Sequence, residues 1–310
     1  MSKKKVKVFA PATISNLGSG FDVIGIALEK FGDIVVAERS KEYGITFSVK
    51  TTEKNIPTGS DNNVAAYVAQ LMLDEFKPNY GVKMVLHKQM PIGSGLGSSA
   101  ASSVASVVAV NALLPKPLQK KDLLRFAVEG ERMASRSPHA DNAAPSLFGG
   151  AVLIRSYFPL DVVQLPVKNK LWWVVARPHI VIRTEDARNI LPHLIDLKAA
   201  IIQWGNFGGL LAGLLEGNAK LVGKSVEDVI IEPVRKRLIP GFDEVKFAAI
   251  NAGALGCSIS GAGPALFAVT DSEKIGKKIA KAMEETFKKQ AKLKCDTFVS
   301  KINMKGAIEI

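Results

Sequence analysis

The stretch "PIGSGLGSSAASS", from Pro91 to Ser103, places three glycines within five residues directly before a run of small and apolar residues. The apolar and β-branched pattern of "VKMVLHK" predicts a strand just before it, and the residues from about 97 to 114 form a helical pattern. A helix N-terminus presents unsatisfied amides and a positive dipole end, and glycines let a backbone approach an anion closely. The stretch therefore predicts an anion-binding loop, with a tight turn whose serines cap the helix as the alternative.

The spacing of this loop matches neither common phosphate-binding motif. No lysine follows Gly97, as "GxxxxGK[ST]" requires, and the glycines are not arranged as "GxGxxG". The charge of a bound nucleotide would therefore be met by backbone amides, a divalent ion and residues from elsewhere in the chain. Glu131, on the predicted helix 119–135, is a candidate metal ligand, and an ordinary solvent-facing glutamate paired with a nearby arginine is the alternative.

Composition restricts the class of protein. A chain of 310 residues that is 47% hydrophobic and 23% charged has enough apolar material for one large or two medium cores. Its apolar runs are too short to span a membrane, and the N-terminus "MSKKKVKVF" has no signal-peptide pattern, so we expect a cytoplasmic protein without membrane contact. Two cysteines form no disulfide framework, and the four histidines lack metal-ligand spacing.

The net charge of +12 is compatible with nucleic acid, a membrane surface or an anionic small substrate. In "KIGKKIAKAMEETFKKQAKLK" helical spacing mixes the lysines with Glu284 and Glu285, which is typical of a solvated helix face. The basic runs contain no series of interleaved aromatic residues, as stacking on bases would require. We therefore expect no nucleic-acid partner, and an anionic small ligand remains compatible with the charge.

Strand-like and helical segments alternate along the chain in a way that indicates an α+β fold. Strand patterns such as "GDIVVAER" and "ITFSVK" dominate the first third, and the last portion reads helix, strand, strand, helix, strand. The division between the two halves is expected near residues 155–170, although no Pro/Gly-rich linker marks it.

Three segments, in the expected order, resemble the motifs of the GHMP kinases. "APATISNLGSGFDVIGIAL" (residues 10–28) is similar to the N-terminal motif of homoserine kinases, "PIGSGLGSSAASS" to the second superfamily motif, and "SISGAGPALFAV" (residues 258–269) to the third. Within the superfamily, "SPHADNAAPSLFGG", "TEDARNILP" and "EPVRKRLIP" resemble homoserine kinase segments. The resemblance implies a two-domain GHMP kinase fold, with a ribosomal protein S5 domain 2-like domain over 1–160, a ferredoxin-like domain over 161–310, and the active site between them.

The resemblance also implies an activity, the ATP-dependent phosphorylation of the side-chain hydroxyl of L-homoserine in threonine biosynthesis, with Mg²⁺ as cofactor. The implied substrate-binding residues are Asn16, Asp22, His139, Asp141, Arg188 and Arg235. The two arginines suit a carboxylate clamp, since guanidinium groups bind carboxylates bidentately. Taken singly, each of the six has a plainer reading as a turn residue, a cap, a helix N-terminal residue or a surface ion-pair partner.

The implied nucleotide-binding residues are Pro91, Ile92, Gly93, Ser94, Gly95, Leu96, Gly97, Ser98, Ser99, Ala100 and Ala101, with Asn63 and Lys88 bordering adenine. Ser99 and Glu131 are the implied magnesium ligands, and the third motif is expected to shape the site without touching substrate. The catalytic candidates are Glu131, Asp141 and Asn142. Whether Asp141 or Asn142 fills the position of the aspartate base of many superfamily kinases stays open, and an asparagine there predicts catalysis by positioning.

Other functions remain open on the sequence. A mevalonate or shikimate kinase would share the phosphate machinery and differ in the acceptor pocket, and a non-catalytic ligand-binding protein would share the fold. A homodimer is possible, because apolar residues of the second half can form either a subunit interface or core.

Overall fold

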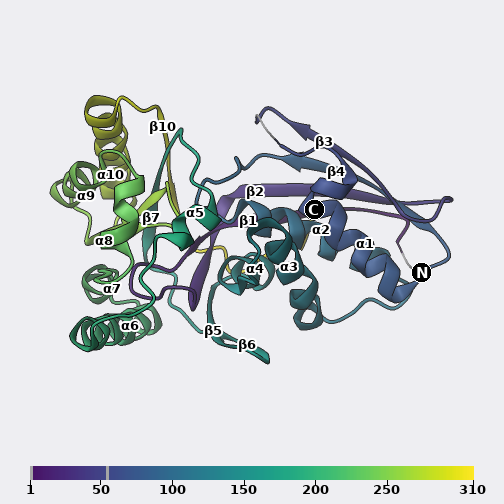
Figure 1. The fold of residues 1–310 in the computed structure, drawn as a ribbon, viewed down its shortest axis with the longest axis horizontal. Helices are drawn as coiled ribbons and strands as arrows, with labels where there is room; N and C mark the ends of the chain where they lie inside the picture. The colour runs from purple at the N-terminus through teal and green to yellow at the C-terminus, as the bar shows by residue number, and fades with distance from the viewer. Residues whose placement is uncertain (1–2, 54–55) are drawn as a thin grey trace.

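The computed structural model describes residues 3–53 and 56–310, which form two β-sheets with helices packed on them (Figure 1). The larger sheet has seven strands, five of them in the order β11-β1-β2-β4-β3, with β5 paired to β2 and β6 to β5. Its strands are β1 (Lys5–Ser15), β2 (Ile24–Ser40), β3 (Ile45–Thr51), β4 (Gly81–Lys88), β5 (Ala151–Tyr157), β6 (Leu160–Leu165) and β11 (Ile308–Glu309). The pairs are antiparallel except β3–β4.

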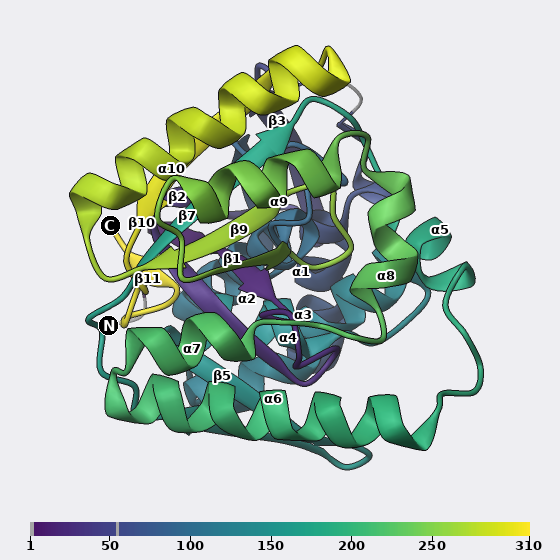
Figure 2. The same cartoon turned by 90° about the vertical axis from the view of Figure 1, so that its left-hand side faces the viewer.

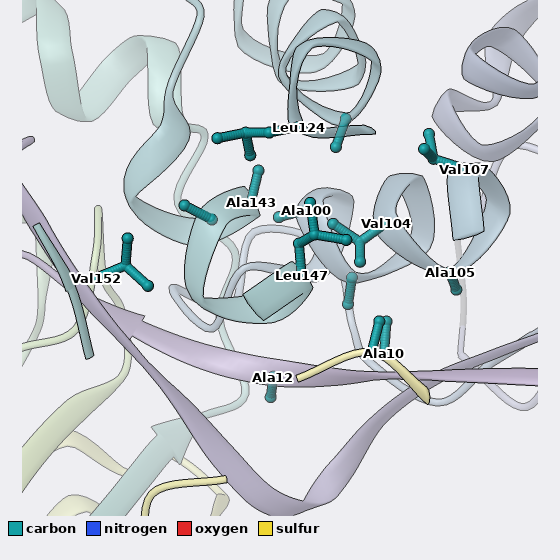
Figure 3. Packing of buried hydrophobic residues seen from close by; sticks show 14 of the residues in the cluster. Ala10, Ala12, Ala100, Val104, Ala105, Val107, Leu124, Ala143, Leu147 and Val152 are labelled. Carbon is teal, nitrogen blue, oxygen red and sulfur yellow. The ribbon is translucent and has the colours of Figure 1, made fainter. Parts of the chain in front are cut away.

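Four helices pack with this sheet: α1 (Val64–Phe76), α2 (Ser98–Leu113), α3 (Lys120–Ser135) and α4 (Ala140–Phe148). Helices α2 and α4 contact β1 and β2 directly, and α1 and α3 pack against α2. Figure 3 shows Ala100 and Val104 of α2 close to Leu147 of α4, all fully buried. The small side chains of α2 let the helix lie close to the sheet, which fixes the position of its N-terminus.

The smaller sheet has the strand order β10-β7-β9-β8, and every pair in it is antiparallel. Its strands are β7 (Trp172–Pro178), β8 (Gly256–Ile259), β9 (Leu266–Thr270) and β10 (Cys295–Ser300). Helices lie between β7 and β8, and α10 (Glu273–Thr286) lies between β9 and β10. A strand-helix-strand-strand-helix-strand succession with this pairing is ferredoxin-like, as the resemblance implied.

The two faces of the smaller sheet belong to different cores. Trp173 and Phe267 pack with α6 (Leu197–Glu216) and α7 (Ala219–Ser225) in the core that also fills the larger domain. Val174 and Leu266, one residue away, pack with α9 (Phe242–Asn251) and α10 on the opposite face (Figure 2). This alternation follows from the period of two along a strand, and it makes the interior continuous between the two sheets.

The chain changes sheets between β6 and β7, and its C-terminal end returns to the first sheet, where Ile308 pairs with Phe9. Because β6 belongs to the larger sheet, we place the division between the domains at residues 165–172, slightly after the predicted 160/161 boundary. Strand β11 at the end of the chain is assigned to the first domain, because it pairs with β1. This division stays a proposal.

Helix α6 leaves several apolar side chains exposed, among them Leu197, Ile201 and Trp204. The homodimer considered from the sequence stays a prediction. Within residues 3–53 and 56–310, no helix combines the length and the apolar character needed to cross a bilayer.

Candidate active site

A cavity of about 460 Å³ lies between the two sheets and is lined by segments of both domains. The short helix α5 (Thr184–Asn189) lies beside it, between the two groups of elements (Figure 1). The predicted site residues that line it are Asn16, Asp22, Asn63, Lys88, Ile92, Gly93, Ser94, Gly95, Gly97, Ser98, Ser99, Glu131, His139, Asp141, Asn142, Arg188 and Arg235. The fold thus brings nearly all of them to one place.

The glycine loop joins β4 to α2 in a backbone path that requires glycine. Gly95 and Gly97 have φ of 76° and 68°, in the left-handed region. A Cβ on Gly95 would lie 2.5 Å from the Ser260 carbonyl oxygen, and one on Gly97 would lie 2.1 Å from Thr13 Oγ1. The loop therefore packs directly against neighbouring chain, and α2 begins at Ser98 with amides that have no intrahelical acceptor.

The third motif supports this loop from the second domain. Ser260 Oγ donates a hydrogen bond to the Gly95 carbonyl at 2.6 Å, and the Ala265 amide donates to the Ser94 carbonyl at 3.3 Å. These contacts hold residues 260–265 against the loop. Residues 261–263 also line the cavity, and the expectation that the third motif does not touch substrate stays a prediction.

Glu131 lies on α3 at the same end of the cavity and is buried. Burial raises the pKa of its carboxyl to about 7, while a hydrogen bond from Ser99 and the charge of Lys88 act in the opposite direction. Its Oε1 atom has no hydrogen-bond partner among the described residues. An unpartnered buried carboxylate oxygen beside a hydroxyl is a donor set that fits a hard divalent cation, because such cations prefer oxygen ligands.

At the other end of the cavity, Asp22 and Arg188 form an ion pair. Arg188 Nη2 donates to the two carboxylate oxygens of Asp22 at 2.9 and 2.7 Å, and it lies 3.3 Å from Nδ1 of His139. Burial lowers the pKa of His139 to about 4, so the imidazole is neutral at pH 7. His139 Nε2 and Arg188 Nε are buried and have no partner in the described part of the chain. This end of the cavity therefore offers fixed polar groups of both signs.

Arg235, on α8 (Glu232–Arg235), is the second arginine of this end. Its Nε donates to the Ala187 carbonyl and its Nη1 to the Gly261 carbonyl, both at 3.1 Å. Burial lowers its pKa to about 10, so the guanidinium is charged at pH 7. The guanidinium groups of Arg235 and Arg188 lie 4.9 and 5.5 Å from the ring centre of Phe21, which gives both cations an aromatic neighbour.

Asn16 acts as a turn residue as well as a wall of the cavity. Its φ is 69°, its Oδ1 accepts the Asp22 amide at 3.0 Å, and its Nδ2 donates to the Gly261 carbonyl at 2.9 Å. Asn16 therefore has the turn role that the sequence offered as its alternative to substrate binding. It orients the segment that carries Asp22 and ties it to the third motif.

Asp141 and Asn142 lie in the first turn of α4, and their surroundings differ. Burial, and then the charge of Asp22, raise the pKa of Asp141 to about 7. Asn142 Oδ1 accepts from Thr13 Oγ1 at 2.6 Å, and its Nδ2 donates to Ser15 Oγ at 3.0 Å. The Asn142 amide is therefore fixed by hydroxyls of β1, directly against Gly97 of the loop.

Comparison with known proteins gives the family. The model described as GHMP kinases N terminal domain matches residues 63–150, and the model described as GHMP kinases C terminal matches residues 210–289. The homoserine kinase of Chlorobium phaeobacteroides is 43% identical over 316 residues, which cover 98% of this chain and 99% of the relative. The chain belongs to the homoserine kinase family.

Other relatives of this family extend the match. The homoserine kinase of Methanococcus vannielii is 39% identical and covers 88% of this chain and 90% of its own length. The crystal structure of homoserine kinase from Cytophaga hutchinsonii superposes with a TM-score of 0.93 at 47% identity, covering 99% of this chain and 98% of that one. The L. major mevalonate kinase, at 16% identity and a TM-score of 0.76, shows the shared fold alone.

Some of the nucleotide-binding residues expected in a homoserine kinase do not reach the cavity. Leu96, Ala100 and Ala101 are fully buried in the core, and Pro91 is also buried away from the cavity lining. Their apolar side chains pack in the core, so any contact with a nucleotide would be made by their backbone, and their place in the nucleotide site stays a prediction. Their contribution is to hold the loop in place.

Several polar residues around the site escaped the sequence analysis. Tyr157 donates from its hydroxyl to the Asp22 carbonyl at 2.8 Å, Thr13 and Ser15 hold Asn142, and Asp33 lies beneath the loop. For Asp33 a signal existed, since a carboxylate inside the apolar strand pattern "GDIVVAER" needs a buried partner. The hydroxyls gave no signal, because Ser, Thr and Tyr are common in strands.

The raised pKa of Glu131 has a consequence for the stability of the ligand-free protein. The folded state keeps a proton that the unfolded chain releases above about pH 4.5, so Glu131 costs stability increasingly as pH rises toward 7. Relative to wild type, Glu131→Gln is expected to gain about 2 kcal/mol of unfolding free energy between pH 5 and pH 8. Urea unfolding of both proteins at the two pH values measures the gain. His139 and Asp141 also make stability depend on pH, and the charge of Glu131 is one cause of the raised pKa of Asp141, so the difference between the two proteins reports the Glu131 carboxyl together with its effect on Asp141. A pH-independent difference would contradict the expectation.

Proposed function

We propose that the chain transfers the γ-phosphoryl group of ATP to the side-chain hydroxyl of L-homoserine, giving ADP and O-phospho-L-homoserine, a step of threonine biosynthesis. The observation that carries the proposal is that the glycine loop and the Asp22–Arg188–His139 group line one cavity. Phosphate chemistry and recognition of a charged acceptor thus meet within one enclosed space. Membership in the homoserine kinase family supports both halves.

The nucleotide phosphates are placed at the loop and the N-terminus of α2. Free amides and the helix dipole favour anions at that point, and the glycines allow close approach. The adenine is placed at the edge of the cavity formed by Ile56, Val64 and Leu86, beside Asn63. Asn63 caps α1 by accepting the Ala65 amide at 3.0 Å, so its side chain also fixes this wall.

Magnesium is assigned to Ser99 and Glu131. The hydroxyl and the unpartnered carboxylate oxygen supply oxygen ligands, and the remaining positions are left for phosphate oxygens and water. When bound, the cation neutralises the charge on the transferring phosphoryl group. Within residues 3–53 and 56–310 no cluster of three His, Cys, Asp or Glu residues is arranged to hold a metal alone, so the nucleotide itself would complete the site.

L-Homoserine is placed at the other end, where the protein already pairs opposite charges. Its carboxylate is assigned to Arg188 and Arg235, and its ammonium and hydroxyl to Asp22, Asn16, His139 and Asp141. The Asp22–Arg188 pair is complementary to a zwitterion. A bound amino acid would replace this one ion pair by two, its carboxylate with Arg188 and its ammonium with Asp22. Neutral His139 adds a polar contact without repelling the ammonium.

The chemical step follows from positioning. The homoserine oxygen attacks the γ-phosphorus, the bond to the β–γ bridging oxygen breaks, and ADP leaves. The transition state is loose, so a protein base adds little, and the hydroxyl proton passes to a phosphate oxygen. Asn142 has no proton-accepting carboxylate, and its amide is engaged with Thr13 and Ser15, which supports a role in aligning β1, α4 and the loop.

Asn142→Ala is therefore expected to lower kcat about tenfold and to leave most of the activity. The reason is that the substitution loosens two hydroxyl contacts without removing a proton acceptor. Steady-state kinetics with saturating ATP and L-homoserine measure the change. A fall as deep as that of Glu131→Gln would contradict catalysis by positioning.

The proposed function is tested by identifying the product. Phosphorus NMR of a reaction containing ATP, magnesium and L-homoserine is expected to show a phosphomonoester on the homoserine side-chain oxygen, together with ADP, and no product when the metal is chelated. Absence of the phosphomonoester with metal present would overturn the proposal.

A further inference from the structure

A buried ion pair lies directly beneath the glycine loop. Lys88, the last residue of β4, contacts Asp33 of β2, and the two side chains are 4% and 0% exposed. Charged side chains are rarely buried to this degree unless both are fully paired, because leaving water costs each of them free energy. The pair lies where β4 ends and the glycine loop begins.

Every donor of the Lys88 ammonium is used inside the protein. It donates to Asp33 Oδ2, to the Ser98 carbonyl at 2.8 Å and to Ser102 Oγ at 2.9 Å. An ammonium has three protons and no acceptor. Lys88 therefore has no proton left for a nucleotide, although it borders the cavity.

Asp33 is saturated in the same way. Its Oδ1 accepts the amides of Gln89 and Met90 at 3.0 and 3.2 Å, and its Oδ2 accepts from Ser102 Oγ at 2.7 Å as well as from Lys88. Residues 89–90 are where the loop leaves β4. Ser98 and Ser102 are in the first turns of α2, where the loop ends.

We propose that Asp33 and Lys88 are positioning residues that fix both ends of the glycine loop for binding the nucleotide phosphates, without touching the nucleotide themselves. The inference rests on the proposed function and assigns Lys88 a role other than bordering adenine. A loop with three glycines loses much conformational entropy when it is ordered. Clamping both its ends in the free protein removes part of that cost from the binding step.

The test is the charge-neutral double variant Asp33→Asn with Lys88→Met, which leaves no unpaired buried charge. Calorimetric titration measures the affinity for ADP and for adenosine, which lacks phosphates. ADP binding is expected to weaken at least about tenfold and adenosine binding to change less than about twofold, since a displaced loop misplaces only phosphate contacts. KM for L-homoserine is expected to stay within about twofold of wild type.

The matched control is Arg155→Met with Asp161→Asn, which removes an ion pair between β5 and β6 whose two residues do not line the cavity, and it is expected to leave ADP affinity unchanged. If the first double variant does not fold, Ser102→Ala tests the inference instead. This substitution removes one hydrogen bond from Lys88 and one from Asp33, and it is expected to weaken ADP binding about threefold. Equal losses for ADP and adenosine, or no loss for ADP, would overturn the inference. Failure of the wild-type protein to bind ADP would overturn the proposed function instead.

Discussion

Glu131→Gln is expected to lower kcat at least about 1,000-fold while the protein stays folded, because the amide keeps the shape of the side chain and loses the charge on which the proposed magnesium site depends. Glu131 is a buried carboxylate that lines the cavity beside the loop, and one of its oxygens has no hydrogen-bond partner among the described residues. The proposed function makes Glu131 a metal ligand, and phosphoryl transfer depends mainly on positioning and on stabilisation of charge, so we expect the loss of this carboxylate to affect the chemical step directly. Steady-state turnover over a range of magnesium concentrations measures it.

The control for this prediction lies on the same helix. Glu129 is partly exposed and pairs with Arg132, so Glu129→Gln removes the same charge two residues away and is expected to change kcat less than about twofold. Activity of Glu131→Gln within about tenfold of wild type at saturating magnesium would exclude Glu131 as a metal ligand.

Arg188→Met is expected to raise KM for L-homoserine about 100-fold and to leave KM for ATP within about threefold of wild type. Arg188 pairs with Asp22 and presents a second nitrogen, Nε, that has no partner among the described residues. Loss of a charge-assisted, bidentate contact to the substrate carboxylate costs on the order of 2–3 kcal/mol, and a methionine keeps the apolar stem. Kinetics with each substrate varied in turn separate the two KM values.

Arg125→Met is the corresponding control, since Arg125 forms an exposed ion pair with Glu75 on α1. Both KM values are expected to stay at the wild-type level in this variant. A rise in KM for ATP equal to that for L-homoserine in Arg188→Met would indicate a disturbed cavity and would argue against a carboxylate contact.

The order of strands and helices followed from periodicity because most elements bury one face. The predicted helix over about 97–114 is α2, Ser98–Leu113, and the predicted helix over 119–135 is α3, Lys120–Ser135. The pairing of Ile308 with Phe9 could not be predicted from the sequence, because the two-residue strand β11 is too short to show a hydrophobic periodicity. The choice of a two-domain GHMP kinase fold came from the three motifs, and hydrophobic patterning is compatible with it without selecting it.

In the candidate site, too, some features could be predicted from the sequence and others could not. Residues inside a motif, such as Asp22 and Arg188, were identified from the resemblance, and the structure places them in contact across 166 positions of the chain. The engagement of Lys88 with Asp33 was missed, because a lysine at the end of a strand carries no local sign of burial or of its partner. Sequence therefore indicated which residues line the cavity more readily than what each side chain does there.

The identity of the phosphoryl acceptor is decided by measuring ADP release with ATP and magnesium in matched reactions that contain L-homoserine, mevalonate, shikimate or no acceptor. We expect turnover with L-homoserine well above the acceptor-free rate, and no turnover above that rate with mevalonate or shikimate. Preferential turnover of mevalonate or shikimate would contradict the acceptor pocket while leaving the phosphate site intact, and no turnover with any acceptor would contradict the enzyme assignment in favour of a ligand-binding protein on the same fold.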